Sequence, residues 1–212
     1  MRIVSAYYSG AYPFDMLPVT DDVTMAMEPD QLKSGDILVV WGGGDIPTQY
    51  YNKGRSRYSG AEKTPGHRDR IEWALMQRAI ELKIPIIGVC RGGQMLCAAA
   101  GGYLIQHVNG HGGYHAVTAP DGTQFMVNSI HHQMMMPADT NHILLAHTTN
   151  PRSDVYMDVD ADGKDTEVKA DMEREYIYFP EIRGHAIQWH PEAMQVESQA
   201  TQFIFNKVEE FL

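Results

Sequence analysis

Cysteine is scarce in this sequence, and the scarcity bears on where the protein works. Only two of the 212 residues are cysteine, Cys90 and Cys97, seven positions apart. On a helix, seven residues separate two Cα atoms by about 10 Å, which is too far for a disulfide. Two reduced thiols are typical of a reducing compartment, so we expect a cytoplasmic protein.

Long apolar runs and clustered basic residues are also missing. No segment approaches the roughly 20 apolar residues of a membrane span, and the N-terminal MRIVSAYYSG lacks the charged-then-apolar order of a signal peptide. The 17 Lys and Arg are outnumbered by 27 Asp and Glu, which gives a formal net charge of −10. Because a phosphate backbone requires clustered positive charge, we expect neither a nucleic acid nor a membrane as partner.

The rest of the composition is that of an ordinary globular protein. Hydrophobic residues make up 43% and charged residues 21%, without low-complexity tracts or an internal repeat. A chain of this length most often forms one domain and buries roughly 70% of its unfolded surface. No linker interrupts the pattern, so we expect residues 1–212 to form a single domain.

The first half has the pattern of a βαβ unit. Residues 1–8 and 36–41 are typical of short strands, and three glycines end the second one abruptly. Apolar residues then recur at helical spacing over 68–83. After a proline, 86–89 is a third apolar strand that leads to Cys90 and a further helix. This order predicts a parallel sheet.

The second half predicts shorter and partly antiparallel strands. Apolar runs separated by turn signals lie at 114–120, 124–130, 142–149, 153–159, 174–180 and 185–190, and an amphipathic helix is expected over 198–211. Residues 46–67 have no period and predict a long loop that controls access to a site. The predicted fold class is α/β, with a mostly parallel central sheet flanked by helices and additional antiparallel strands in the C-terminal half.

Cys90 lies where a buried strand gives way to a helix, with Gly88 two residues before it and Gly92 two residues after. Small flanking residues permit the sharp turn that exposes a nucleophile above a sheet. The start of a helix also favours a thiolate. For an isolated cysteine, a small buried side chain at a tight crossing is the more common explanation.

The segment QWHPE at 188–192 supplies a base for this thiol. Side chains two apart on an extended segment project to the same side, so His190 and Glu192 can lie together. Glu192 can then orient the imidazole while the other ring nitrogen faces the thiol. The backbone N–H groups of WGGGD, after another buried strand, could receive a developing oxyanion. Taken singly, each segment is also explained by a surface turn.

Six ordered motifs together resemble the class I (triad) glutamine amidotransferases, in particular the branch that contains the γ-glutamyl hydrolases. The resemblance covers nearly the whole chain and implies a flavodoxin-like fold. It rests on GGGD at 42–45, RDRIE at 68–72, GVCRGGQ at 88–94, the glycine pair at 101–102, VNSIHHQ at 127–133 and QWHPE at 188–192.

The resemblance implies a role for each matching residue. Cys90 would be the nucleophile, His190 the base and later acid, and Glu192 the residue that orients it. The oxyanion-hole N–H groups would belong to Gly43 and Arg91. The substrate-binding residues would be Gly44, Gln94, Ser129, Ile130 and His131. Attack on a γ-glutamyl amide would give a thioester that water hydrolyses, with no metal or organic cofactor.

The sequence leaves the use of this reaction open. An ammonia-donating subunit would serve a separate synthetase, because the chain has no room for a second catalytic domain. A free-standing enzyme would cleave γ-glutamyl peptides or amines. A non-catalytic binding protein could keep the same fold. The oligomeric state is open too, a homo-oligomer included.

Two other signals favour structural explanations. Residues 158–169 begin like a calcium loop, but Lys169 occupies the position of the bidentate glutamate, so an Asp-Gly hairpin is expected. His107, His111 and His115 have the four-residue spacing of metal ligands on a helix. Intervening glycines break any such helix, so we expect loop histidines and no metal site. The methionines at 134–136 are expected to pack under a loop.

Overall fold

Parallel and antiparallel pairing meet in one central sheet. The computed structural model describes residues 1–212, and its largest sheet has nine strands in the order β2-β1-β3-β4-β14-β13-β10-β7-β8. The pairings from β2 to β14 are parallel, and those from β14 to β8 are antiparallel. The strands are β1 (Arg2–Ala6), β2 (Asp22–Ala26), β3 (Ile37–Val40), β4 (Ile86–Val89), β7 (Gly112–Thr118), β8 (Gln124–Ile130), β10 (Ile143–Thr148), β13 (Arg174–Phe179) and β14 (Gly184–Ile187).

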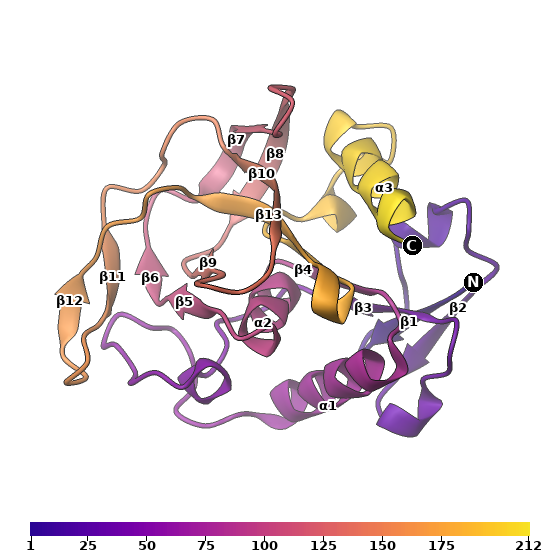
Figure 1. Ribbon diagram of the computed structural model, residues 1–212, viewed down its shortest axis with the longest axis horizontal. Helices are drawn as coiled ribbons and strands as arrows, with labels where there is room; N and C mark the ends of the chain where they lie inside the picture. Colours follow the sequence, from indigo (N-terminus) through magenta and orange to yellow (C-terminus); the bar gives the residue numbers. More distant parts are fainter.

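Helices cover both faces of this sheet. Helices α1 (His67–Leu82) and α2 (Arg91–Ala99) lie on one face, and α3 (Gln199–Phe211) lies on the other (Figure 1). In β3, Leu38 and Val40 pack in the same apolar cluster as α1 and α2, while Ile37 and Val39 pack in the cluster that contains α3. Successive strand residues point to opposite faces, so β3 is apolar throughout because both of its faces are covered.

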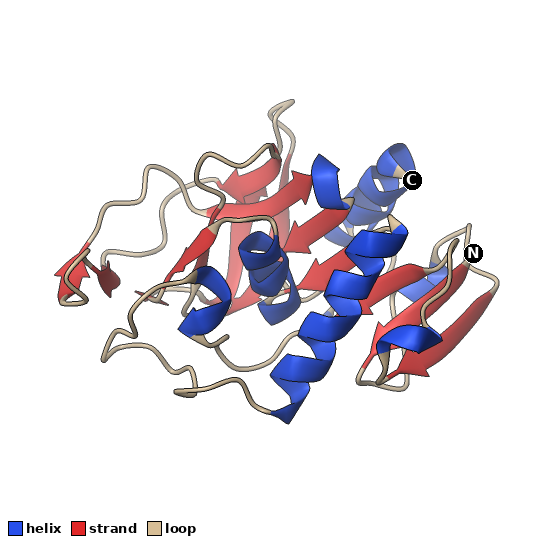
Figure 2. Cartoon of the chain, turned by 60° about the horizontal axis from the view of Figure 1, so that its bottom comes forward, coloured by secondary structure: helices blue, strands red, loops and turns tan.

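Two smaller sheets and five short 3-10 turns complete the chain (Figure 2). One sheet has the order β12-β11-β6, and the other pairs β5 with β9. Their strands are β5 (Tyr103–Ile105), β6 (His107–Val108), β9 (Met134–Met136), β11 (Tyr156–Val159) and β12 (Asp165–Glu167), and the turns are Phe14–Met16, Pro29–Gln31, Thr48–Tyr51, Pro180–Ile182 and Pro191–Ala193.

The predicted α/β class is confirmed, and the antiparallel strands of the second half are present. The Asp-Gly hairpin is also confirmed, because β11 and β12 pair around it. Asp158 is buried there, where it accepts from Gln106 and pairs with Lys53. The methionines at 134–136 form β9, with Met134 and Met135 buried. The single domain stays a prediction.

The loop at 46–67 is held in place by polar contacts to distant strands. Ser56 donates its backbone N–H to Gln106 Oε1 over 2.9 Å and its hydroxyl to Asp165 over 2.6 Å. Near its start, the Ile46 N–H donates to Gln133 Oε1 over 3.0 Å. The loop therefore has a defined conformation that follows the edge of the molecule where β3 ends.

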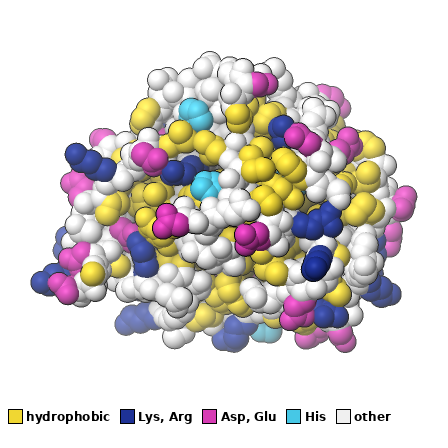
Figure 3. Space-filling model, viewed as in Figure 1, with side chains coloured by type: hydrophobic (Ala, Val, Ile, Leu, Met, Phe, Trp, Pro, Cys, Tyr) yellow, Lys and Arg dark blue, Asp and Glu magenta, His cyan; other side chains and the backbone are white.

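The surface carries charges of both signs. On the face shown in Figure 3, acidic and basic side chains are interspersed, and no continuous basic patch is visible. Among the helices, none combines the length and the apolar character needed to traverse a bilayer.

Replacing Ile204 by alanine should lower the free energy of unfolding by about 2–5 kcal/mol, because a fully buried side chain is lost from the layer between α3 and the sheet. Urea denaturation followed by circular dichroism measures the change. Glu209→Ala, on the exposed side of the same helix, should alter it by less than about 0.5 kcal/mol. Equal losses in the two variants would contradict the burial of Ile204.

Candidate active site

Cys90 occupies a strained turn between β4 and α2. Its backbone has φ 49° and ψ −106°, a conformation that non-glycine residues rarely adopt. The turn is fixed on both sides, because the Cys90 N–H donates to Ile187 O over 2.6 Å and the Cys90 carbonyl accepts from Gln94 N over 2.9 Å. Such a turn is typical of a nucleophile at the crest of a sheet.

The glycines around Cys90 are required by close backbone contacts. A Cβ at Gly92 would lie 2.1 Å from Val40 O, and one at Gly88 would lie 2.5 Å from the carbonyl of Gly92. A Cβ at Gly93 would lie 2.8 Å from Ile187 O. The helix therefore begins directly against the neighbouring strands β3 and β14. This confirms that the flanking glycines permit a tight strand-to-helix crossing.

His190 reaches this turn because β14 lies beside β4. The two strands are parallel and Ile187 pairs with Val89, so the residues that follow them emerge at the same edge of the sheet. Asn128 clamps the histidine backbone: its Oδ1 accepts from His190 N over 2.9 Å, and its amide donates to His190 O over 2.8 Å. Asn128 lies within one of the six motifs, but this contact was not expected from the sequence.

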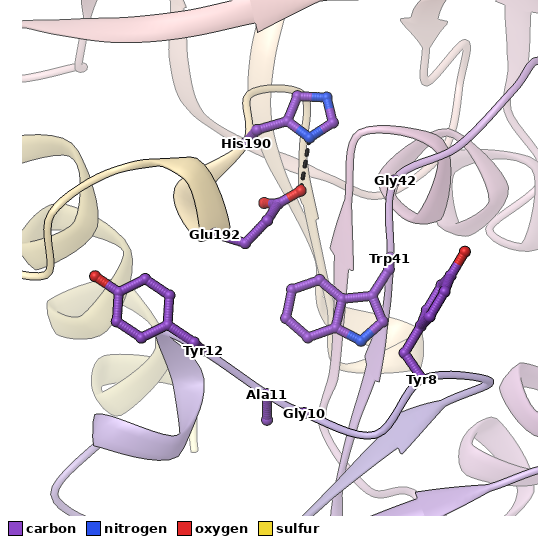
Figure 4. A pocket seen from close by; sticks show the side chains of 8 residues that line it. All are labelled: Tyr8, Gly10, Ala11, Tyr12, Trp41, Gly42, His190 and Glu192. Carbon is purple, nitrogen blue, oxygen red and sulfur yellow. Dashed lines mark hydrogen bonds and ion pairs between the residues drawn. The ribbon is translucent and has the colours of Figure 1, made fainter.

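The His190 ring is bonded to Glu192 on one side and faces Cys90 on the other. Nδ1 and Glu192 Oε1 are 2.7 Å apart, as Figure 4 shows. A Cβ at Gly42 would lie 2.7 Å from His190 Cε1 and 3.6 Å from Cys90 Cβ, so both side chains lie against the same glycine. Nε2 is buried without a hydrogen-bond partner. The three predicted side chains are therefore brought together.

The surroundings of His190 favour the imidazolium. Burial by itself would lower the pKa of His190, but its interactions with Cys90 and Glu192 outweigh burial and raise the pKa to about 10. The positive ring lies beside the Cys90 side chain. The arrangement can therefore hold a nucleophile and a proton donor side by side.

A buried charge network on α1 braces the glycine loop at 42–45. Arg68 donates to Gly42 O over 2.8 Å and to Glu72 over 2.9 Å. Arg91, the residue after Cys90, bonds to both Glu72 and Asp69. Gly43 lies between the two arginines, because a Cβ there would approach Arg68 Nη1 to 2.6 Å and Arg91 Cδ to 2.9 Å. The sequence marked 68–72 as a motif without giving it this role.

Gln94 lies beneath the turn within a group of buried glutamines. Its amide donates to Gln133 O over 3.1 Å and lies 3.4 Å from Gln188 Oε1. The Gln188 amide is in turn 3.8 Å from Cys90 Sγ. Gln133 and Gln188 were not singled out from the sequence, although both belong to its motifs. They connect Gln94 to Cys90 and to the segment at 129–133.

The other predicted binding residues alternate at the end of β8. Ser129 and His131 turn inward, with Ser129 Oγ donating to His111 O over 3.1 Å and His131 Nδ1 lying 3.0 Å from Gln133 O. Ile130 between them is 72% exposed. Gly44 has open space around it, since a Cβ there would meet nothing within 4 Å. The side chains of Ser129 and His131 are therefore used in contacts within the protein, and Ile130 is the exposed one of the three.

An aromatic hollow adjoins His190 on the side of the first strand. It has a volume of about 340 Å³, and Tyr8, Tyr12 and Trp41 contribute its rings beside His190 and Glu192 (Figure 4). Tyr8 lies just after the carboxyl end of β1, where open α/β sheets place their ligands. Tyr8 was not singled out from the sequence, although its place at the end of a predicted strand indicates a position near the site.

Comparison with known proteins assigns the chain to a family. The sequence profile of the family described as peptidase C26 matches residues 3–192. The chain belongs to the peptidase C26 family. The glutamine amidotransferase-like protein YvdE of Lactococcus lactis is 28% identical over 178 residues, which cover 74% of this chain and 66% of YvdE. The expected resemblance to glutamine amidotransferases is thereby confirmed.

Solved structures share the fold at low sequence identity. A Thermoplasma acidophilum protein named for a GMP synthase component has a TM-score of 0.64 at 14% identity, covering 100% of this chain and 93% of its own. A glutamine amidotransferase of Thermotoga maritima has a TM-score of 0.54 at 12% identity, covering 99% and 81%. The curated relatives are only partly covered by the match. In three of them, the matched segment spans 28%, 66% and 50% of the relative's own length.

Replacing Glu72 by glutamine should lower the free energy of unfolding by about 3–5 kcal/mol, because it removes a buried carboxylate shared by two arginines. Chemical denaturation measures the loss. Glu81→Gln on the same helix is the matched control, since the Arg78–Glu81 pair is exposed and should contribute less than about 1 kcal/mol. A Glu72 variant as stable as the control would show that the network does not support the loop.

Proposed function

We propose that this protein hydrolyses γ-glutamyl amides through a Cys90–His190–Glu192 triad and a glutamyl thioester. The observation that carries the proposal is the strained turn of Cys90 beside an imidazole whose far nitrogen is bonded to Glu192. A nucleophile, a base and an orienting carboxylate in that order are the minimum for this class of acyl transfer. Membership of the peptidase C26 family and relatives named for glutamine amidotransferases support it.

Acylation would begin with the Cys90 thiolate, paired with the protonated His190, attacking the γ-carbonyl carbon. The N–H groups of Gly43 and Arg91 would receive the oxygen as it gains negative charge. His190 would then give its Nε2 proton to the departing nitrogen, so that the C–N bond breaks and an amine or ammonia leaves. Glu192 would hold the ring in the orientation for this transfer.

Deacylation would use the same groups in reverse. Neutral His190 would take a proton from water, and the resulting hydroxide would attack the thioester carbonyl. The C–S bond would break, glutamate would leave, and the thiolate–imidazolium pair would be restored. Gly44, Gln94 and the backbone of 129–131 would bind the glutamyl group during both steps, with Ile130 as the exposed member of that segment.

The size of the leaving group separates two uses of this chemistry. An ammonia-donating subunit would pass ammonia to a separate synthetase, whereas a free-standing hydrolase would release a larger amine. The aromatic hollow beside His190 favours the second use, because ammonia alone would not fill about 340 Å³. Its rings also suit a cationic or aromatic amine.

Glutamate release from glutamine and from γ-glutamyl-p-nitroanilide tests the proposal. Replacing Cys90 by serine should lower both rates by at least roughly a thousandfold, because the thiolate is lost. Cys97→Ser is the matched control: this thiol is buried against Tyr103 O on the far side of α2 and should leave the rates close to wild type.

The two substrates also separate the alternatives. A higher kcat/KM for the anilide supports a free-standing hydrolase, and activity on glutamine alone that rises with an added synthetase supports the ammonia-donating role. A folded wild-type protein that releases glutamate from neither substrate, with or without a synthetase, would overturn the enzymatic proposal and support a binding protein on this fold.

The pH profile should report the ionisation of His190. Because its pKa is raised to about 10, the ring stays protonated through neutral pH, and kcat/KM should fall as the pH rises through about 10. Glu192→Gln removes one of the bonds that raise this pKa, so the alkaline limb should move to lower pH and the rate should fall about tenfold or more. If the alkaline limb of the pH profile stays in place in this variant, Glu192 is not the residue that orients His190.

A further inference from the structure

Three histidines and two glutamates form a second buried cluster, behind the segment at 129–131. Their side chains come from different elements: His111 precedes β7, His115 lies on it, His131 follows β8, and Glu173 and Glu175 belong to the chain that enters β13. The side chains are no more than 3% exposed. The mechanism proposed above uses none of these side chains.

The distances in this cluster centre on one carboxylate oxygen. Glu175 Oε1 lies 3.7 Å from His111 Nδ1 and 3.9 Å from His131 Nε2. One ligand atom from each of these three residues can be chosen so that all lie within 4.8 Å of one another. Ligands about 2.0–2.1 Å from a tetrahedral Zn²⁺ are roughly 3.3 Å apart, so a small contraction of the cluster would complete such a site.

The second nitrogens of His111 and His131 each lie near an oxygen atom of the protein. The other nitrogen of His111, Nε2, lies 3.3 Å from Glu173 Oε1. The other nitrogen of His131, Nδ1, lies 3.0 Å from Gln133 O. His115 Nε2 is 3.1 Å from Glu175 Oε1. Ligating histidines almost always place their second nitrogen against a carboxylate or a carbonyl, because this fixes the tautomer and the ring orientation.

The inward-facing nitrogens have no hydrogen-bond partners in the protein. His111 Nδ1 and His131 Nε2 are buried and unbonded, and so are His111 Nε2, His115 Nδ1 and the second carboxylate oxygen of Glu175, Oε2. Leaving such groups unpaired costs free energy, which a bound cation would offset.

A surface hollow adjoins the cluster. A hollow of about 350 Å³ is lined by both His111 and His131, together with the glycines on either side of His111 and the exposed Ile130. A metal ion could enter there, and a water molecule could complete its coordination from the same side.

We propose that His111, His131 and Glu175 bind a divalent transition metal ion, with Zn²⁺ as the best match to two imidazoles, one carboxylate and an open position. His115 and Glu173 are positioning residues for these ligands. The proposal departs from the sequence expectation of no metal site, which rested on the glycines between His107, His111 and His115 and on the substrate-side role that the family resemblance gives to His131 and His132. It does not rest on the proposed function.

A metal ion here would tie together the ends of β7 and β8 and the start of β13. β13 is distant in sequence from the β7–β8 hairpin, and β8 carries the backbone of 129–130. Binding of the ion to the folded state alone would raise the midpoint of thermal unfolding, because the site does not exist in the unfolded chain.

The test uses the Cys90→Ser protein, which removes the thiolate that could itself bind zinc together with His190. After chelator treatment and dialysis, Zn²⁺ is titrated by calorimetry and counted by elemental analysis, and Co²⁺ is added to record its visible d–d bands. Glu175→Gln and His111→Gln are the variants. His132→Gln is the matched control, because His132 lines the same hollow but is exposed and lies against Asp45.

One Zn²⁺ per chain is expected, with four- or five-coordinate Co²⁺ bands and a higher unfolding midpoint. Both variants should lose affinity by at least about a hundredfold, and His132→Gln should retain it. Circular dichroism of the metal-free variants checks that they fold. If one of Glu175→Gln and His111→Gln does not fold, the zinc affinity of the other variant tests the site. Absence of stoichiometric binding by the parent protein, or variants that bind as tightly as the control, would overturn the site and leave the cluster as a histidine–carboxylate hydrogen-bond network.

Discussion

The close crossing of α2 over the ends of β3 and β14 is the constraint on which the rest of the structure depends. Gly92 and Gly93 lie so near Val40 O and Ile187 O that no side chain fits between them. This crossing forces Cys90 into a backbone conformation that costs of order 1–3 kcal/mol, which the surrounding sheet and helix must offset. The same crossing places the residue after Cys90 at the start of a helix, beside the glycine loop that follows β3.

Charge buried in α1 holds that glycine loop against the turn. Glycines at 42–44 have little conformational preference of their own, so their positions must be fixed from outside. Arg68 does so by bonding the carbonyl of Gly42, and Glu72 connects it to Arg91. Because the partners are buried and mutually bonded, the network favours one arrangement of loop, helix and turn over others.

The antiparallel half of the sheet contributes the residue that holds His190 in place. Parallel strands bring the ends of β3, β4 and β14 to one edge, where Gly42, Cys90 and His190 meet. The hairpin of β7 and β8 then curves past this edge and contributes Asn128, which clamps the backbone of His190. Behind it, the histidine–glutamate cluster links β7, β8 and β13, so the segment at 129–131 is supported by polar contacts as well as by the sheet.

The sequence by itself determined the elements with strong local patterns: the apolar strands, the helix that begins near Arg68, and the glycine-flanked turn at Cys90. It also paired His190 with Glu192, although the contact is made across the 3-10 turn Pro191–Ala193 and not across the extended backbone that was expected. Strands β5 and β9 escaped prediction since their three residues are too few to show a period, and β2 (DVTMA) escaped because it lacks the continuous apolar run of β3 and β4. Tertiary structure alone decided the bracing by Arg68 and Glu72, the place of Tyr8 in the hollow that His190 also lines, and the meeting of His111, His131 and Glu175. Those contacts join residues far apart in the chain, and only the packing of the whole sheet fixes which of many polar side chains become neighbours.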